Sequence, residues 1–66
     1  MNTLGDELPK EQTRVREVLA AYKELGRAGA IGAMFIEDSL AKADRAAISG
    51  DITLIIEALN DLRGIQ

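Results

Sequence analysis

The chain has 66 residues, a net charge of −3 and neither histidine nor cysteine. A chain of this length forms one domain with a small core, and residues 1–66 are taken as a single helical domain. The missing residue types exclude disulfides, thiolate metal sites and the commonest general base. We therefore expect no metal, no cofactor and no enzymatic activity, and stability must come from regular helix packing or from association with a second chain.

Residues 1–8 show no helical periodicity and predict an extended or frayed lead-in. A helix is predicted over residues 9–25, because a proline at the first helical position gives up no hydrogen bond. Its apolar residues recur at spacings of three and four, which is typical of a helix with one buried face. These residues are Val15, Val18, Leu19, Tyr22 and Leu25. Gly26 follows, at the usual position of the left-handed residue that ends a helix.

A second helix, expected to be the longest, is predicted over residues 28–49. Its core stripe contains small residues that let a neighbouring backbone come close, and it consists of Gly29, Gly32, Ala33, Ile36, Leu40, Ala43 and Ala47. Ile31, Met34 and Phe35 lie outside this stripe, whereas the polar face begins only at Glu37. The first half of this helix therefore carries more apolar surface than two neighbouring helices can cover.

The segment Ser49–Asp51 combines a glycine helix end with an aspartate N-cap, so it predicts almost no loop before a third helix over residues 52–63. The inner stripe of this helix is Ile52, Ile55, Leu59 and Leu62, with Ile56 on its flank and Leu54, Ala58 and Ile65 on another side. The run ITLII also fits a strand, but the polar residues after it continue a helical period and a lone strand has no partner. The predicted fold class is all-α, with three helices, short connections and a long central helix.

Motifs that could carry chemistry lack their required context. The three glycines Gly26, Gly29 and Gly32 have no strand before them and no Gly-Lys-Ser/Thr after them, so a phosphate loop is rejected. A calcium loop placed on Gly50 would begin at Arg45 and end at Ile56, and neither residue is a ligand. No catalytic, cofactor-binding or metal-binding residue is assigned.

The surplus apolar surface is expected to be a protein interface, because exposed contiguous apolar patches usually mark one. The expected interface residues are Gly29, Ile31, Gly32, Met34, Phe35, Ile36 and Leu54. The leading hypothesis is a non-enzymatic protein–protein interaction module, either a homodimer that buries residues 29–36 of both chains or the binder of another protein. The alternative is a nucleic-acid-associated protein that uses a basic face of the first helix, formed by Arg16, Lys23 and Arg27. An acidic total charge and the lack of interleaved aromatic residues count against that alternative.

The N-terminal segment has acids and a proline where a signal peptide needs an apolar region, and the longest apolar run is about half a membrane span. The segment ADRAAISGDITLIIEALNDL resembles the helical hairpins of tetratricopeptide-type repeats, but no second copy follows. The chain as a whole, with LPKEQTRVREVL, GAIGAMFIED and ISGD in that order, resembles a group of small uncharacterised proteins encoded by bacteriophages and prophages. This resemblance implies a bacterial cytoplasm and a small accessory protein that binds a host or phage protein. It implies no activity.

Overall fold

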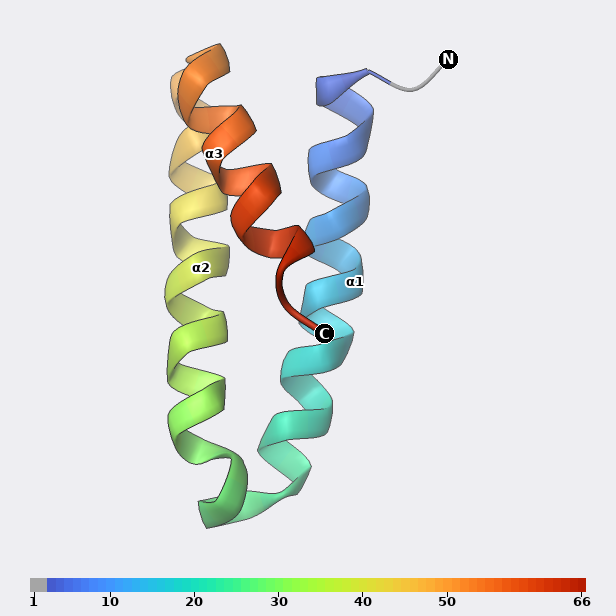
Figure 1. Cartoon of the computed structure of the whole chain (residues 1–66), viewed down its shortest axis with the longest axis vertical. Coiled ribbons are helices and arrows are strands. Elements are labelled where there is room, and N and C mark those ends of the chain that lie inside the picture. The colour runs from blue at the N-terminus through green and yellow to red at the C-terminus, as the bar shows by residue number, and fades with distance from the viewer. Residues whose placement is uncertain (1–2) are drawn as a thin grey trace.

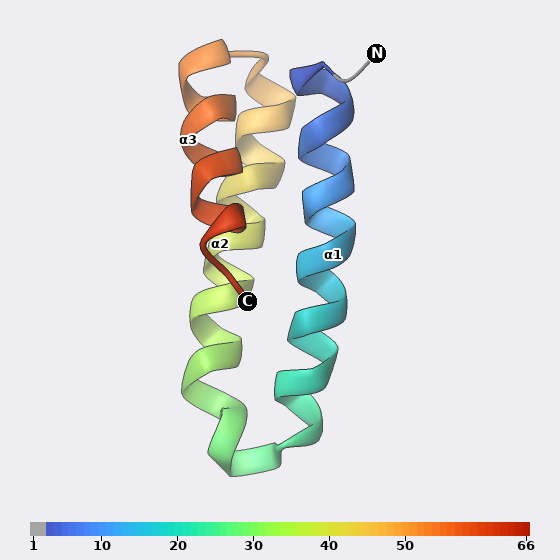
Figure 2. The same cartoon turned by 45° about the vertical axis from the view of Figure 1, so that its right-hand side comes forward.

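A computed structural model describes residues 3–66, which form a bundle of three α-helices and one short 3-10 helix (Figure 1). Helix α1 covers Leu4–Glu24, η1 covers Gly26–Gly29, α2 covers Ala30–Ser49 and α3 covers Ile52–Arg63. The all-α class and the long central helix are confirmed, and α3 has the predicted bounds. The molecule is elongated, 37 × 21 × 16 Å, because α1 and α2 run side by side over their whole length (Figure 2).

Helix α1 begins five residues before its predicted start at Pro9, and with 21 residues it is slightly longer than α2, which has 20 and was expected to be the longest helix. The predicted lead-in over residues 1–8 is therefore wrong from Leu4 onward, while residues 1–2 lie outside the described residues. Pro9 lies inside the helix, where it removes one backbone hydrogen bond. The additional turn must be stabilised by other contacts.

Two contacts stabilise the first turn of α1. The Thr3 hydroxyl oxygen accepts a hydrogen bond from the Asp6 N–H at 3.3 Å and donates one to the Asp6 carboxylate at 3.1 Å. This N-cap satisfies a backbone amide that has no partner within the helix, and the carboxylate lies at the positive end of the helix dipole. One turn further on, the side chain of Leu8 is only 2 % exposed. The N-terminal end of α1 is thus both capped and anchored in the core.

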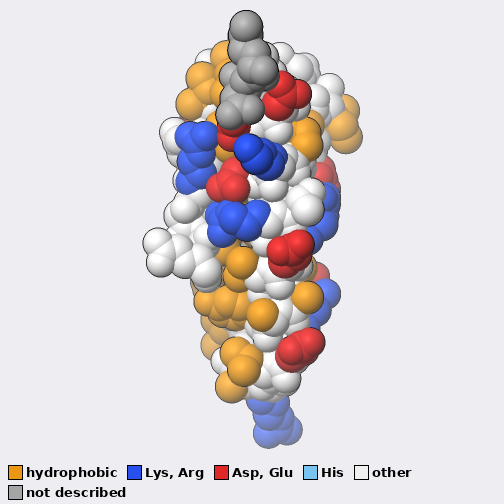
Figure 3. Space-filling view, turned by 90° about the vertical axis from the view of Figure 1, so that its right-hand side faces the viewer, with side chains coloured by type: hydrophobic (Ala, Val, Ile, Leu, Met, Phe, Trp, Pro, Cys, Tyr) orange, Lys and Arg blue, Asp and Glu red, His pale blue; other side chains and the backbone are white. Residues whose placement is uncertain are grey.

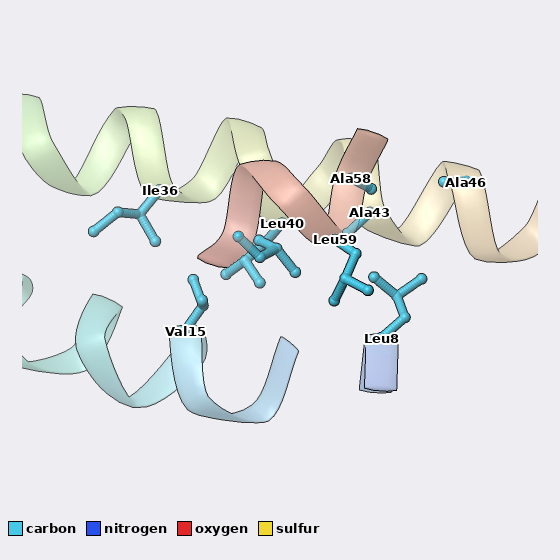
Figure 4. Packing of buried hydrophobic residues seen from close by; sticks show 9 residues of the cluster. Leu8, Val15, Ile36, Leu40, Ala43, Ala46, Ala58 and Leu59 are labelled. Carbon is cyan, nitrogen blue, oxygen red and sulfur yellow. The ribbon is translucent and has the colours of Figure 1, made fainter. Parts of the chain in front are cut away.

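The core lies where all three helices meet, and its side chains converge from α1, α2 and α3 (Figure 4). Its buried residues are Leu8, Val15, Ile36, Leu40, Ala43, Ala46, Ala58, Leu59 and Leu62. Val15 and Leu62 are fully buried. Helix α2 contributes two alanines at this crossing and α3 a third, and these small side chains let the two helices pack closely.

Three predicted core residues are exposed: Leu25, Ala47 and Ile52. Leu25 is the C-cap of α1 and Ile52 is the first residue of α3, so each lies at the end of its own helix. On α2 the buried residue is Ala46 rather than Ala47. The reason is that α3 packs on the Ala46 side of α2 through Ala58, which the sequence pattern had placed on another side of α3.

The glycines at the α1–α2 connection permit close packing within the chain. Gly26 has φ of +61°, which confirms its predicted role as a left-handed helix end. Residues 26–29 then form η1, so α2 begins two residues later than predicted. A Cβ on Gly29 would overlap the carbonyl oxygen of Tyr22, and a Cβ on Gly32 would lie 2.6 Å from Cε2 of the Tyr22 ring. The close approach expected of these glycines is therefore made to α1.

The α2–α3 connection follows the prediction. Gly50 has φ of +69°, and Asp51 accepts hydrogen bonds from the Thr53 N–H at 2.9 Å and the Leu54 N–H at 3.2 Å. With only these two residues between the helices, α3 must fold back antiparallel to α2. This connection fixes which residues of the two helices lie at the same height.

Arg14 of α1 holds the C-terminal end of α3. Its guanidinium donates hydrogen bonds to the carbonyl oxygens of Leu62 and Ile65, both at 2.9 Å, and its Nε donates to the Glu11 carboxylate at 2.9 Å. The last carbonyls of a helix have no partner within it and carry partial negative charge, so a cation there is favourable. The hydrogen bond between the two side chains lowers the pKa of Glu11 and raises the pKa of Arg14. The sequence pattern did not predict this contact.

Candidate interaction surface

Three large apolar side chains on the N-terminal half of α2 are exposed to solvent. Ile31 is 71 % exposed, Met34 69 % and Phe35 71 %, and we call these three residues the α2 apolar surface. They are uncovered because α3, with 12 residues, ends near the middle of the 20-residue α2 (Figures 1 and 2). Figure 3 shows the molecule from the α1 side, where hydrophobic side chains are visible on the lower half and also near the upper end, among charged ones.

The structure corrects part of the predicted interface. Gly29 and Ile36 are buried inside the chain, and Gly32 is half-buried beside the Tyr22 ring. These three residues serve intrachain packing and do not offer a surface to a partner. The exposed members of the predicted set are the α2 apolar surface and Leu54 of α3, which is 45 % exposed.

Other exposed apolar side chains had been assigned to the core or had not been singled out. Leu25 is 62 % exposed at the end of α1. Ile48 and Ile52 are 87 % and 64 % exposed at the opposite end of the molecule, on either side of the α2–α3 connection. Their exposure could have been predicted from their position at helix ends, where fewer neighbouring residues are available to cover a side chain.

A groove lies between α2 and α3, and we call it the α2–α3 groove. It is lined by four residues of each helix: Lys42, Arg45, Ala46 and Ser49 of α2, and Leu54, Glu57, Ala58 and Asp61 of α3. Its apolar residues are the two alanines and Leu54. The α2 rim carries two bases and the α3 rim two acids. A second hollow continues along α2 over the α2 apolar surface, with Glu37 and Asp38 at its edge.

The predicted basic face of α1 lies largely against acids of α2. Arg16 is 3.5 Å from the Asp44 carboxylate, and Lys23 is 3.9 Å from the Glu37 carboxylate. Asp44 also accepts a hydrogen bond at 2.8 Å from the side chain of Gln12. Both ion pairs are half-exposed and of the kind that contributes little to stability, but each reduces the positive field that a phosphate backbone would meet. Of the three predicted bases, Arg27 lies in η1 and forms no ion pair with the described residues.

Within residues 3–66, no group of three acidic side chains is placed to hold a metal ion, and no helix has the length and apolar character needed to cross a bilayer. Comparison with protein-family models, with curated proteins and with solved structures gives no match for this chain. The fold and surface define a small three-helix protein with an exposed apolar face on its central helix. Any function must be inferred from that surface.

Proposed function

We propose that this chain is a small non-enzymatic protein–protein interaction module whose binding site is the α2 apolar surface. The observation that carries the proposal is the exposure of Ile31, Met34 and Phe35, each about 70 % accessible on one half of one helix. Removing a large apolar side chain from water stabilises a complex by about 1.5–3 kcal/mol. Three such side chains are a substantial part of the free energy available to so small a domain.

The resemblance of the sequence to small phage and prophage proteins supports placing the module in a bacterial cytoplasm, as an accessory factor. Its partner in this proposal is a host protein, a phage protein or a second copy of the chain. The nucleic-acid alternative would use the basic face of α1. The pairing of Arg16 and Lys23 with acids of α2 favours the protein partner.

The test compares the unaltered chain with Phe35→Glu and Ile31→Glu as immobilised baits in a bacterial lysate, together with the mass of each variant in solution. Ile48→Glu is the matched control, because Ile48 is equally apolar and more exposed but lies at the other end of α2. We expect both surface variants to lose bound protein and the control to retain it, with helicity unchanged in all. A monomer in solution that captures the same proteins with and without Phe35→Glu would refute the proposal.

A further inference from the structure

We propose that a second copy of this chain docks in the α2–α3 groove, about a two-fold axis that runs parallel to the groove. This inference rests on the proposed function in that it names the partner of an interaction module. It is carried by the charges on the two rims of the groove, which are brought together by the packing of α3 on α2.

The bases on the α2 rim and the acids on the α3 rim lie at nearly the same height, meaning the same distance along the helices from the α2–α3 connection. Helices α2 and α3 are antiparallel and joined by Gly50 and Asp51, so height can be counted from that connection. Arg45 is five residues before Gly50, and Glu57 is six residues after Asp51. Since a helix rises about 1.5 Å per residue, this base and this acid differ in height by only one or two ångström. Lys42 and Asp61 form a second matched pair one turn further along.

Two axes in the plane of the contact keep the helices of both copies aligned, one parallel to the groove and one across it, and the charge pattern selects between them. A two-fold axis parallel to the groove places the α2 rim of one copy over the α3 rim of the other at unchanged height. Arg45 of each copy then faces Glu57 of the other, and Lys42 faces Asp61. An axis across the groove would instead place bases over bases and acids over acids, which is repulsive. Only the parallel axis gives a complementary interface.

The rim charges are available for such contacts. Among residues 3–66, Arg45, Glu57 and Asp61 make no ion pair within the chain. Lys42 is 3.2 Å from Asp38 of its own helix, and both side chains are more than half exposed. Arg45 and Glu57 are therefore the pair on which a test should act.

The same axis also covers apolar surface. Leu54 lines the groove and is 45 % exposed, whereas the two alanines of the groove are already buried in the core. Phe35 is seven residues, or two helical turns, from Lys42, so it lies on the same side of α2 as the groove rim. Because the axis leaves height unchanged, the two Phe35 side chains of the dimer lie at one level. A standard-size protein interface buries about 800 Å² of each partner. For this chain that area is about a sixth of its 4581 Å² surface.

The test is a charge swap measured by sedimentation over a series of chain concentrations. We expect the unaltered chain to dimerise, and Arg45→Glu and Glu57→Arg each to weaken the dimer. The dimer contains two copies of each pair, so each single change should raise the dissociation constant about 10-fold or more. The double variant Arg45→Glu with Glu57→Arg should recover most of the lost affinity, because it exchanges the charges and keeps their complementarity. Raising the salt concentration should weaken the unaltered dimer.

Lys10→Glu and Glu17→Arg are matched controls, since they make the same changes of net charge on exposed positions of α1 outside the groove. Both should leave the dissociation constant unchanged, and circular dichroism should show equal helicity for all variants. A chain that is monomeric at every concentration would overturn this inference, while capture of another protein by the α2 apolar surface would leave the proposed function standing. A dimer that Phe35→Glu disrupts but the rim substitutions do not would refute the groove geometry and support the interaction module.

Discussion

The contact between Gly32 and the Tyr22 ring makes a quantitative prediction about stability. A Cβ on Gly32 would lie 2.6 Å from Cε2 and 2.7 Å from Cδ2 of that ring, both well inside van der Waals contact. Gly32→Ala therefore pushes the ring by about 1 Å, and such overpacking costs about 1–3 kcal/mol. Alanine is also favoured over glycine in a helix interior by about 1 kcal/mol. The net loss in the unaltered chain is thus about 0–2 kcal/mol.

The sign should reverse when the ring is removed. In a Tyr22→Ala background the clash is absent, so Gly32→Ala should stabilise the chain by about 1 kcal/mol. The coupling energy between the two sites should be about 1–3 kcal/mol. Gly29→Ala is the internal control, because its Cβ would overlap backbone atoms of Tyr22 that remain in the Tyr22→Ala chain. It should be destabilising in both backgrounds.

Urea denaturation followed by circular dichroism measures these free energies, with all chains at one concentration because dimerisation would add to apparent stability. Tyr22→Leu serves as a second background, since it removes the ring and keeps more of the apolar packing. An equal cost of Gly32→Ala with and without the ring would refute the role assigned to Gly32, which is to accommodate Tyr22.

Three further predictions concern the α1–α2 connection, the N-cap of α1 and the hydrogen bond between Glu11 and Arg14. Gly29→Ala should cost about 3 kcal/mol, because the clash is with backbone, and should lower the melting temperature by about 12–24 °C; an unchanged melting curve would contradict the packing at η1. Thr3→Ala should cost about 1 kcal/mol, whereas Thr3→Ser should be nearly neutral, as measured by urea denaturation. The pKa of Glu11 is lowered by its hydrogen bond from Arg14, so its stabilising contribution is complete above its unfolded pKa of about 4.3 and is lost as the pH falls through the lower folded value. Glu11→Gln should therefore reduce stability at neutral pH and flatten the acid limb of the pH–stability curve, and an unaltered acid limb would contradict the contact with Arg14.

Local signals in the sequence were sufficient for the third helix, for the α2–α3 connection and for the end of α1, but not for the η1 helix between α1 and α2. Gly50 and Asp51 have one physical role each, a left-handed backbone and an N-cap, and the structure confirms both. Gly26 likewise ends α1 as its position predicted. The predicted start of α1 was wrong because Pro9 was taken as the first helical residue. The Thr3-x-x-Asp6 spacing upstream is itself an N-cap signal.

Contacts that depend on how helices cross could not be read from periodicity. The choice between Ala46 and Ala47 as a core residue depends on which side of α2 is covered by α3. The hydrogen bonds of Arg14 to the end of α3 join residues about 50 positions apart, and no local pattern encodes them. The same limit applies to the candidate site, because the opposite rims of the α2–α3 groove become visible only when the two helices are placed together.

Of the residues predicted to form an interface, some are exposed and some are buried inside the chain. Ile31, Met34 and Phe35 are exposed as expected, since α3 ends near the middle of α2. Gly29 and Ile36 were included because small and apolar residues suit either an interface or a core. Gly29 is buried because Tyr22 packs against it, and Ile36 is buried in the core between the helices.

The central claim is that the exposed side of α2, together with α3, binds a second copy of the chain through complementary charged rims. The most direct measurement is the mass in solution across a dilution series of the unaltered chain, Arg45→Glu and the double variant with Glu57→Arg. We predict twice the chain mass of 7.1 kDa for the unaltered chain and the double variant at high concentration, and a shift toward the single-chain mass for Arg45→Glu. A single-chain mass for the unaltered chain at every concentration, or a double variant no more dimeric than Arg45→Glu, would contradict the claim.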